Sequence, residues 1–265
     1  MKATLRVVIV GGGLGGLACA ISCRRAGLNV IVLEKAPEIM QVGAGIQVPS
    51  NGVKVLDRLG LLSAIKEKGT QIDSLSLVRY SDGELLGHRE LGRPFIEKVG
   101  APWFVIHRAD YHRILFDEAS RLGADIRLNS NAVTVDSATS KVVLEDGEII
   151  TADVVVGADG LWSSTRESIL DNQSPPYETG DLAYRATFTR EELQSLNDPE
   201  VEKVCSRSAV TVWVGPEKHC VFYPLRNGEI YNLVLLGPDN LPAGTRTENG
   251  SIHEMRAAFE GWDNM

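Results

Sequence analysis

Residues 5–34 decide the fold, and they read LRVVIVGGGLGGLACAISCRRAGLNVIVLE. The apolar, β-branched run at 5–10 predicts a buried strand, and the glycines at 11–16 predict a turn. Residues 17–26 have helical character and end at Gly27, a residue type that commonly closes helices. A second apolar run at 29–33 predicts another strand. The stretch is therefore a β-α-β unit, and its two strands should be parallel.

The glycine turn has the GxGxxG spacing of a dinucleotide-binding site, carried by Gly11, Gly13 and Gly16. The first glycine allows a tight turn, the second lets backbone approach a diphosphate, and the third lets helix and strand pack closely. The helix N-terminus adds free N–H groups and a partial positive charge. Glu34 ends the second strand, where its carboxylate can accept hydrogen bonds from a ribose diol and would repel a 2′-phosphate. FAD or NAD is therefore expected rather than NADP; a glycine turn in a purely structural sheet is the alternative.

Composition excludes several classes of protein. The chain has 265 residues, of which 43% are hydrophobic and 23% charged, and its formal net charge is −8. An acidic chain without a basic run is a poor partner for nucleic acid or an anionic membrane. Neither a signal peptide nor a membrane span is recognisable, so a cytoplasmic location is expected. Histidines and cysteines lack metal-ligand spacing, so no metal site is expected.

The rest of the chain alternates short strands with helices. Runs at 75–80 and 84–91 flank Ser81-Asp82-Gly83 and indicate a hairpin. Helices are expected at 109–122 and at 51–59, the latter capped by Asn51. Further strands are expected at 126–128, 133–136, 142–144, 149–150, 154–156, 183–189, 210–214, 219–224 and 230–236. Ser251 and Glu254 form a capping-box pattern before a last helix with an apolar stripe. The stripe residues are Ile252, Met255, Phe259 and Trp262.

Three further motifs make the chain recognisable. Residues 154–166 read VVVGADGLWSSTR and contain DGxxSxxR from Asp159 to Arg166. His107-Arg108-Ala109-Asp110 opens the long helix, and Gly43-Ala44-Gly45-Ile46-Gln47 follows the second strand. Together with the glycine turn, these motifs resemble the para-hydroxybenzoate hydroxylase type of FAD-dependent aromatic monooxygenases, and within it the salicylate hydroxylase-like branch.

The resemblance implies an α/β fold, in which a Rossmann-like FAD-binding domain with a parallel sheet and helices is joined to a smaller mixed-sheet substrate domain. The FAD-binding domain would comprise residues 1–71 and 100–175, the substrate domain residues 72–99 and 176–250, and residues 251–265 would start a C-terminal helix. Relatives carry a later Gly-Asp motif, which Gly180-Asp181 does not match, and the chain ends at Met265. We therefore expect a C-terminally shortened member, whose exposed helix stripe another copy in a homo-oligomer would cover.

The resemblance also assigns a FAD site. The glycine turn and Glu34 would hold the ADP part, and Arg108 would reach the phosphate and ribitol region. Asp159, with Gly160 making room, would serve both FAD and the nicotinamide cofactor. The cofactor-binding residues implied in this way are Gly11, Gly13, Leu14, Gly15, Gly16, Glu34, Lys35, Gln47 near the flavin, Arg108, Val133 beside the adenine, Asp159 and Gly160. For Arg166, a role in this site and a purely structural salt bridge that fixes the following helix are equal alternatives.

The reaction implied by the resemblance is hydroxylation of a phenol- or aromatic-acid-like substrate. NADH or NADPH would reduce the flavin, O2 would form a C4a-hydroperoxide, and its distal oxygen would be transferred to the ring. His219 and Tyr223 resemble a His-x-x-x-Tyr pair near substrate in relatives, and Arg185 could pair with a substrate carboxylate. A surface histidine, a core tyrosine and a strand-edge arginine are the structural alternatives.

A competing hypothesis comes from a different class of protein. The chain could be a flavoprotein-like fold without redox turnover, used to bind or shape a ligand. An NAD-dependent dehydrogenase is a third possibility, but it would leave the DGxxSxxR motif unexplained.

Overall fold

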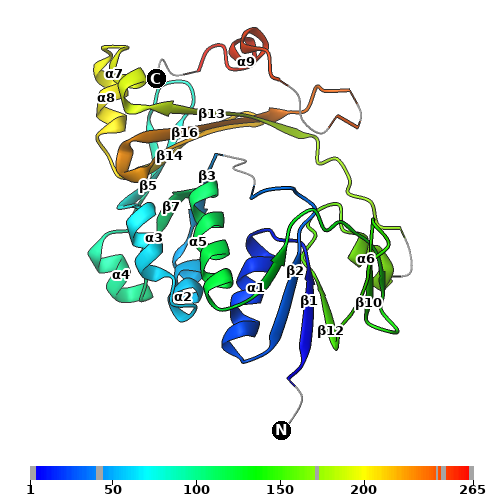
Figure 1. Ribbon diagram of the computed structural model, residues 1–265. Helices are drawn as coiled ribbons and strands as arrows, with labels where there is room; N and C mark the ends of the chain where they lie inside the picture. The colour runs from blue at the N-terminus through cyan, green and yellow to red at the C-terminus, as the bar shows by residue number, and fades with distance from the viewer. Residues whose placement is uncertain (1–3, 40–43, 171–172, 243, 246–248, 263–265) are drawn as a thin grey trace. The chain divides into compact units, whose positions relative to one another are not determined.

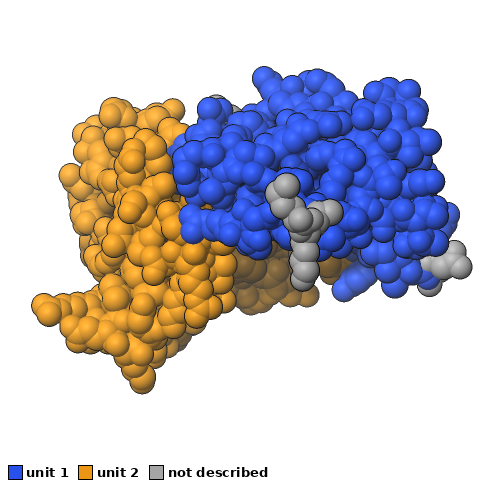
Figure 2. Space-filling model, turned by 60° about the horizontal axis from the view of Figure 1, so that its bottom comes forward, with its two compact units in different colours: residues 1–42, 109–177 blue, residues 43–108, 178–265 orange. Residues whose placement is uncertain are grey.

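The computed structural model describes residues 4–39, 44–170, 173–242, 244–245 and 249–262. Two compact units make up the chain, and Figure 2 colours them separately. Unit 1 comprises residues 1–42 and 109–177, and unit 2 comprises residues 43–108 and 178–265. Each unit is therefore discontinuous in sequence.

The unit boundaries differ from the predicted domain boundaries at residues 71 and 100. Residues 44–71 and 100–108 belong to unit 2. Their strands β3 (Gly45–Val48), β4 (Thr70–Gln71) and β7 (Phe104–His107) form a small sheet, and Val105 of β7 packs with Tyr223 and Leu225 of the same unit. Gly43, the first residue of the Gly43-Ala44-Gly45-Ile46-Gln47 motif, lies outside the described residues.

Unit 1 is built on a parallel sheet with the strand order β12-β1-β2-β8 (Figure 1). Its strands are β1 (Arg6–Val10), β2 (Asn29–Leu33), β8 (Asp125–Arg127) and β12 (Val154–Gly157). Helix α1 (Leu14–Arg25) connects β1 to β2 and packs against both. Four of the five residues in β1, and likewise in β2, are buried, as their apolar runs predict for strands covered on both faces. The predicted parallel β-α-β unit is confirmed.

A second sheet in unit 1 covers the face of the parallel sheet that α1 leaves open. It is antiparallel, with the order β11-β10-β9. Its strands are β9 (Ala132–Asp136), β10 (Lys141–Leu144) and β11 (Ile149–Thr151). The shared core consists of Val8, Val10, Ile31 and Leu33 from the parallel sheet with Val135, Val142, Leu144 and Ile150 from the antiparallel one. Helices α5 (Arg108–Arg121) and α6 (Ser164–Leu170) complete the unit, the boundary to unit 2 falling at the start of α5.

Unit 2 is built on a larger, mixed sheet with the order β13-β16-β15-β14-β5-β6. Its strands are β5 (Ser74–Arg79), β6 (Leu85–Glu90), β13 (Asp181–Thr189), β14 (Ala209–Gly215), β15 (Lys218–Leu225) and β16 (Ile230–Pro238). The β14–β5 pair is parallel and the other pairs are antiparallel. The predicted hairpin around Ser81-Asp82-Gly83 is confirmed as β5 and β6.

The remaining elements of unit 2 surround this sheet. They are β3 (Gly45–Val48), β4 (Thr70–Gln71), β7 (Phe104–His107), α2 (Ser50–Arg58), α3 (Leu62–Lys68), α4 (Arg93–Val99), α7 (Arg190–Gln194), α8 (Pro199–Cys205), the 3-10 turn η1 (Arg226–Gly228) and α9 (Ile252–Ala258). Among the helices of the described residues, none combines the length and the apolar character needed to cross a membrane.

Two predicted helix starts were wrong. Asn51 does not cap α2, because Pro49 occupies the cap position with an extended backbone and Ser50 already begins the helix. Helix α1 begins at Leu14 rather than at residue 17. Glycines have low helix propensity, so the sequence pattern placed Gly15 and Gly16 in the turn, but packing against the sheet overrides that preference.

The last helix is partly covered by its own unit. The Ser251 hydroxyl accepts a hydrogen bond from the Glu254 N–H, which confirms the predicted N-cap. Trp262 packs against Tyr80, with ring centroids 5.4 Å apart, and against Phe259 at 4.9 Å. A second subunit is therefore not needed to cover this end of the stripe, although Ile252 is 64% exposed. A homo-oligomer stays a prediction.

Candidate functional site

The predicted dinucleotide residues of unit 1 gather at one edge of its parallel sheet. The glycine turn follows β1, Glu34 follows β2, and Asp159 follows β12. These are the carboxyl ends of three adjacent strands, with β1 in the middle. Open α/β sheets bind ligands outside the carboxyl ends of their strands.

Packing of the turn requires glycine at Gly11 and at Gly16, for a different reason at each position. Gly11 has φ +107°, which favours glycine, and a Cβ there would overlap the backbone of Ala158 after β12. A Cβ on Gly16 would overlap the backbone carbonyl of Gly11. By contrast, a Cβ on Gly13 or Gly15 would meet no described atom within 4 Å. The turn is thus packed tightly on the sheet side and open on the other.

The N-terminus of α1 faces this open side without a side-chain cap. Gly13 is the N-cap residue, and the first backbone bond of the helix runs from the Leu17 N–H to the Gly13 carbonyl. The N–H groups of the first turn consequently have no intrahelical partner. They are available to an anion, together with the positive end of the helix dipole.

Glu34 is held against the glycine turn. One carboxylate oxygen accepts the Gly12 N–H at 2.8 Å, and the other accepts the Ala36 N–H at 2.9 Å. A Cβ on Gly12 would lie 2.9 Å from the Glu34 Cβ, so this position also requires glycine. The sequence analysis gave Gly12 no role; its signal was the unbroken run of three glycines. A carboxylate accepts about four hydrogen bonds, so Glu34 retains capacity for a diol.

Asp159 is engaged by the start of α6. Its Oδ1 accepts the Ser163 hydroxyl at 2.6 Å, and its Oδ2 accepts the Thr165 N–H at 3.0 Å, the Thr165 hydroxyl at 3.1 Å and the Ser164 hydroxyl at 3.3 Å. Partial burial raises the pKa of this carboxyl, but the hydrogen bonds outweigh burial and its pKa lies below the ordinary value. The side chain of Asp159 is therefore saturated within its own motif, and its proposed contact with cofactors has to involve the adjacent backbone.

Replacing Asp159 with alanine is expected to destabilise unit 1 by roughly 1–3 kcal/mol near pH 7, because the Thr165 N–H at the start of α6 and three hydroxyl groups lose a charged acceptor. Since the folded-state pKa is depressed, this contribution is present above the unfolded pKa and is lost as pH falls through the folded pKa. Denaturant unfolding of both proteins at about pH 7 and about pH 3 measures it. An equal difference at both pH values would contradict this account.

Arg166 completes the motif through backbone carbonyls. Its guanidinium donates to the Leu161 carbonyl at 3.2 Å and the Ser174 carbonyl at 2.6 Å. The salt bridge, one of the two alternatives for Arg166, is replaced by these carbonyl acceptors, which likewise hold the chain around α6. The DGxxSxxR pattern is thus explained within unit 1 as a helix-start device.

The other predicted cofactor residues are placed as follows. Val133 is 46% exposed on β9, and Ser130, three residues before it, donates its N–H to the Glu34 carbonyl. Lys35 and Arg108 have exposed side chains, and the Arg108 N–H donates to the Ala44 carbonyl within unit 2. Gln47 is half-buried on β3, also in unit 2. Gly160 has φ +77°.

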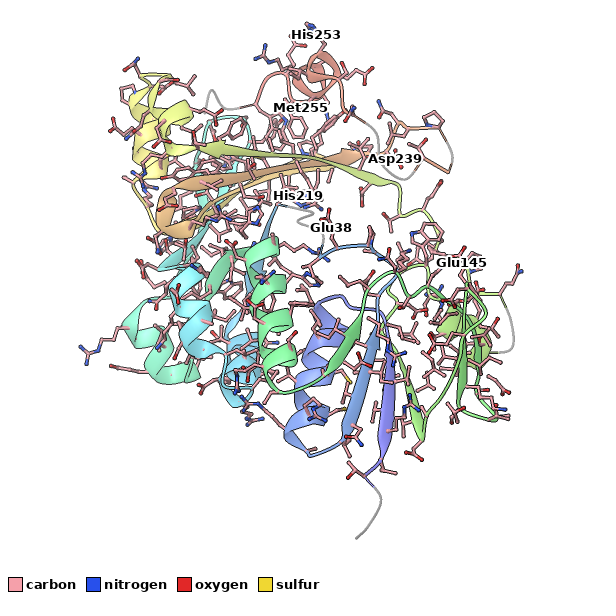
Figure 3. The ribbon with its side chains drawn as sticks, viewed as in Figure 1. Glu38, Glu145, His219, Asp239, His253 and Met255 are labelled. Atoms are coloured by element: carbon pink, nitrogen blue, oxygen red, sulfur yellow. The ribbon has the colours of Figure 1, made fainter. Side chains whose placement is uncertain are left out.

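In unit 2, the predicted catalytic residues share one face of the large sheet. The register pairs Tyr223 with Asn232, His219 with Leu236, and Val234 with Arg185 across β15, β16 and β13. Directly paired residues of antiparallel strands point to the same side, as do alternate residues of one strand. His219 (Figure 3), Tyr223 and Arg185 therefore point to one side. The neighbouring Tyr184 points to the opposite side and lies against Gly250.

Tyr223 and Asn232 form the buried centre of this face. Tyr223 is 4% exposed and Asn232 is fully buried. The Asn232 Oδ1 accepts the Gly45 N–H at 2.9 Å, and a Cβ on Gly45 would lie 2.7 Å from the Tyr223 hydroxyl. Strand β3 is thereby tied down over the tyrosine ring. Asn232 was not predicted; a single amide within the apolar run of β16 was the available signal.

Tyr223 cannot act as a base on this face, because it keeps its proton. Burial raises the pKa of Tyr223 to about 12, and the charge of Arg185 only partly opposes this effect. The hydroxyl is protonated at neutral pH, so Tyr223 can donate a hydrogen bond but cannot accept a proton from a phenol. His219 is half-buried. Within the described residues, no group of three or more His, Cys, Asp or Glu side chains could hold a metal ion.

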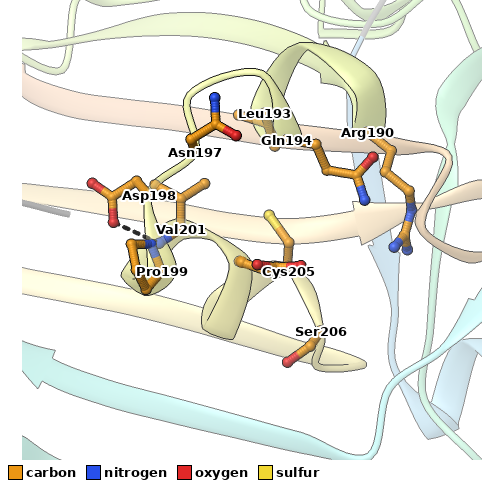
Figure 4. A pocket seen from close by; sticks show the side chains of 10 residues that line it. Arg190, Leu193, Gln194, Asn197, Asp198, Pro199, Val201, Cys205 and Ser206 are labelled. Carbon is orange, nitrogen blue, oxygen red and sulfur yellow. Dashed lines mark hydrogen bonds between the residues drawn. The ribbon is translucent and has the colours of Figure 1, made fainter.

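A surface cavity of about 420 Å³ lies beside α7 and α8 (Figure 4). It is lined by Arg190, Leu193, Gln194, Asn197, Asp198, Pro199, Val201, Glu202, Cys205 and Ser206. Two of its polar side chains already serve the fold: Asp198 caps α8, and Arg190 donates to the Gly228 carbonyl at 2.8 Å. None of the predicted site residues lines this cavity.

Comparison with known proteins identifies the family. A family model described as an FAD binding domain matches residues 4–258. The chain belongs to this family of FAD-dependent aromatic monooxygenases. The α/β fold class and the recognition made from the motifs are therefore confirmed.

Two curated proteins resemble the chain along all or nearly all of its length. It is 38% identical over 268 residues to the FAD-dependent monooxygenase OpS4 of Beauveria bassiana (strain ARSEF 2860), covering 100% of this chain and 62% of that protein. It is 34% identical over 264 residues to the 3-hydroxybenzoate 6-hydroxylase of Klebsiella oxytoca, covering 98% of this chain and 64% of that protein. The chain thus spans less than two thirds of these relatives.

Solved structures of other proteins share the fold. The tetrameric form of 2-methyl-3-hydroxypyridine-5-carboxylic acid oxygenase matches with a TM-score of 0.77 and 26% identity over 97% of this chain and 65% of that one. Klebsiella pneumoniae HpxO complexed with FAD and uric acid matches with a TM-score of 0.82 and 22% identity over 100% and 64%. The second likeness shows the fold alone.

Proposed function

We propose that the chain forms the FAD- and substrate-binding part of a monooxygenase that uses NADH or NADPH to hydroxylate a phenol- or aromatic-acid-like substrate. The observation that carries the proposal is the open glycine turn with Glu34 bonded to it by a 2.8 Å hydrogen bond. The names of the relatives, among them a 3-hydroxybenzoate hydroxylase, support an aromatic substrate.

The residues present at the turn fit the ADP part of FAD. The cradle is free of side chains at Gly13 and Gly15, offers unpaired N–H groups from α1, and places a carboxylate beside it. Diphosphate oxygens suit the N–H groups, and a ribose diol suits Glu34. Bound FAD would supply the redox and oxygen-transfer chemistry. Further contacts with FAD are proposed for Lys35, Arg108, Gln47, Val133 and the backbone at residues 159–160.

On the substrate side, the chain's own residues would orient an aromatic ring. Tyr223 would donate a hydrogen bond to a ring oxygen, since its hydroxyl keeps its proton. Arg185 carries the positive charge of this face and would pair with a substrate carboxylate. His219 would take the phenol proton, because an imidazole nitrogen can accept a proton whereas a guanidinium and a protonated tyrosine hydroxyl cannot. A phenolate is a better nucleophile than a phenol.

Absorbance and fluorescence titration test the proposal. The purified chain, supplied with FAD, should show the flavin absorption bands and quench FAD fluorescence, whereas FMN should bind far more weakly because it lacks the adenosine and the second phosphate. NADH oxidation stimulated by hydroxybenzoates would support turnover. A chain that does not bind FAD at any concentration would refute the proposal. Flavin-independent binding of an aromatic ligand would instead favour the non-redox alternative.

A further inference from the structure

The glycine turn is held by a second element besides β2. The imidazole Nε2 of His112, on α5 in unit 1, lies 2.7 Å from the Gly12 carbonyl oxygen. A carbonyl only accepts hydrogen bonds, so Nε2 carries a proton and donates it. The N–H of the same glycine donates to Glu34. The backbone of Gly12 is therefore fixed at both of its polar groups.

Fixing this carbonyl also fixes the next N–H group. The Gly12 carbonyl and the Gly13 N–H belong to one planar trans peptide group, so they point in opposite directions. Among the described residues, no acceptor for the Gly13 N–H is found, and a Cβ on Gly13 would meet nothing within 4 Å. His112 thus aims this N–H away from α5 and into the open side of the turn.

Without such a bond, this peptide group would be free to rotate. Gly12 and Gly13 lack side chains, and glycine readily populates several backbone conformations. A ligand that needs one orientation would then bear the entropic cost of selecting it. A hydrogen bond from a half-buried imidazole on a fourteen-residue helix removes that freedom in advance.

We propose that His112 is a positioning residue of the dinucleotide site, which aims the Gly13 N–H at the diphosphate of the bound nucleotide. The inference rests on the proposed function and deepens it. It assigns His112 to recognition of a diphosphate, and not of the adenine or the flavin ring.

The test compares three probes on the full chain: FAD, ADP and adenosine, the last two by displacement of FAD fluorescence quenching. His112→Leu should weaken FAD and ADP about 10-fold, the effect of losing one hydrogen bond to a charged group, and leave adenosine unchanged. His112→Gln should restore most of the affinity, because its amide N–H can reach the carbonyl. His253→Leu, at an exposed histidine on α9 (Figure 3), is the matched control and should change nothing.

Each other outcome has a definite meaning. Unchanged FAD and ADP affinity in His112→Leu overturns this inference and leaves the proposed function intact. An equal loss for adenosine also overturns it, because the turn would then be generally disordered rather than misaimed. Failure of the unmodified chain to bind FAD or ADP refutes the proposed function, and this inference with it. If His112→Leu does not fold, His112→Asn, whose amide is too short to reach Gly12, replaces it in the same comparison.

Discussion

Alanine at Gly16 is expected to unfold the glycine turn and to weaken FAD binding by at least about 100-fold. The added Cβ would overlap the backbone carbonyl of Gly11, and Ala158 leaves little room beyond it. Relief requires movement of the main chain, and overpacking of this kind costs about 3 kcal/mol. For a chain of this size, that corresponds to a fall in Tm of roughly 6–12 °C. Thermal unfolding and FAD titration measure the two effects.

Gly15→Ala is the matched control, since its Cβ would enter open space one residue earlier in the same helical turn. Alanine has a higher helix propensity than glycine by up to about 1 kcal/mol, so Tm should stay constant or rise. Equal changes in Tm for the two variants would show that the tight contact between Gly16 and Gly11 does not exist in solution.

The dinucleotide site was largely predictable because it depends on local sequence. A strand, a glycine turn, a helix and an acidic residue follow one another within residues 5–34, and short-range spacing determines where each lies. The structure places Gly11, Gly13, Gly16 and Glu34 together at the end of the sheet, as that spacing predicts. Their contacts with FAD remain proposals.

The parts that were missed depend on contacts between distant residues. His112 is 100 residues from Gly12 in sequence, and Asn232 is 187 residues from Gly45. No periodicity or motif in a single sequence reports such pairs. The unit boundary differs from the predicted domain boundary for a related reason: β3 and β7 look like ordinary short strands, and contacts with distant residues of unit 2, such as that of Gly45 with Asn232, place residues 44–71 there.

Asp159 shows a different limit of prediction from sequence. Its place in DGxxSxxR was read correctly as a motif, yet a motif does not tell whether a carboxylate faces a ligand or the backbone. In the structure, Ser163 and Thr165 occupy that carboxylate. The hydroxyl residues of the motif were the available clue, because serine and threonine near a helix start commonly take part in capping.

Alanine at Gly45 is expected to weaken binding of the proposed aromatic substrate strongly while leaving FAD affinity nearly intact. The new Cβ would lie 2.5 Å from the Tyr223 Cε2 and 2.7 Å from its hydroxyl oxygen. Neither partner can yield easily: Tyr223 packs among Ile72, Leu91, Val105, Val210 and Leu225, and Asn232 holds the Gly45 N–H. The tyrosine hydroxyl is therefore displaced. Hydroxybenzoate-stimulated NADH oxidation should fall at least about 100-fold, which corresponds to the loss of roughly 2.7 kcal/mol of binding.

A double-mutant cycle separates this clash from a general loss of stability. In a Tyr223→Leu background, the ring atoms that meet the new Cβ are gone, so Gly45→Ala should cost much less in unfolding free energy than it does in the unmodified chain. Gly87→Ala on β6, where a Cβ would meet only the Leu77 side chain at 3.8 Å or more, controls for adding a methyl group elsewhere in unit 2. Additive costs of the Gly45 and Tyr223 changes would mean that the two residues do not touch in solution. The substrate face would then have to be sought at Arg185 and His219, without the tyrosine.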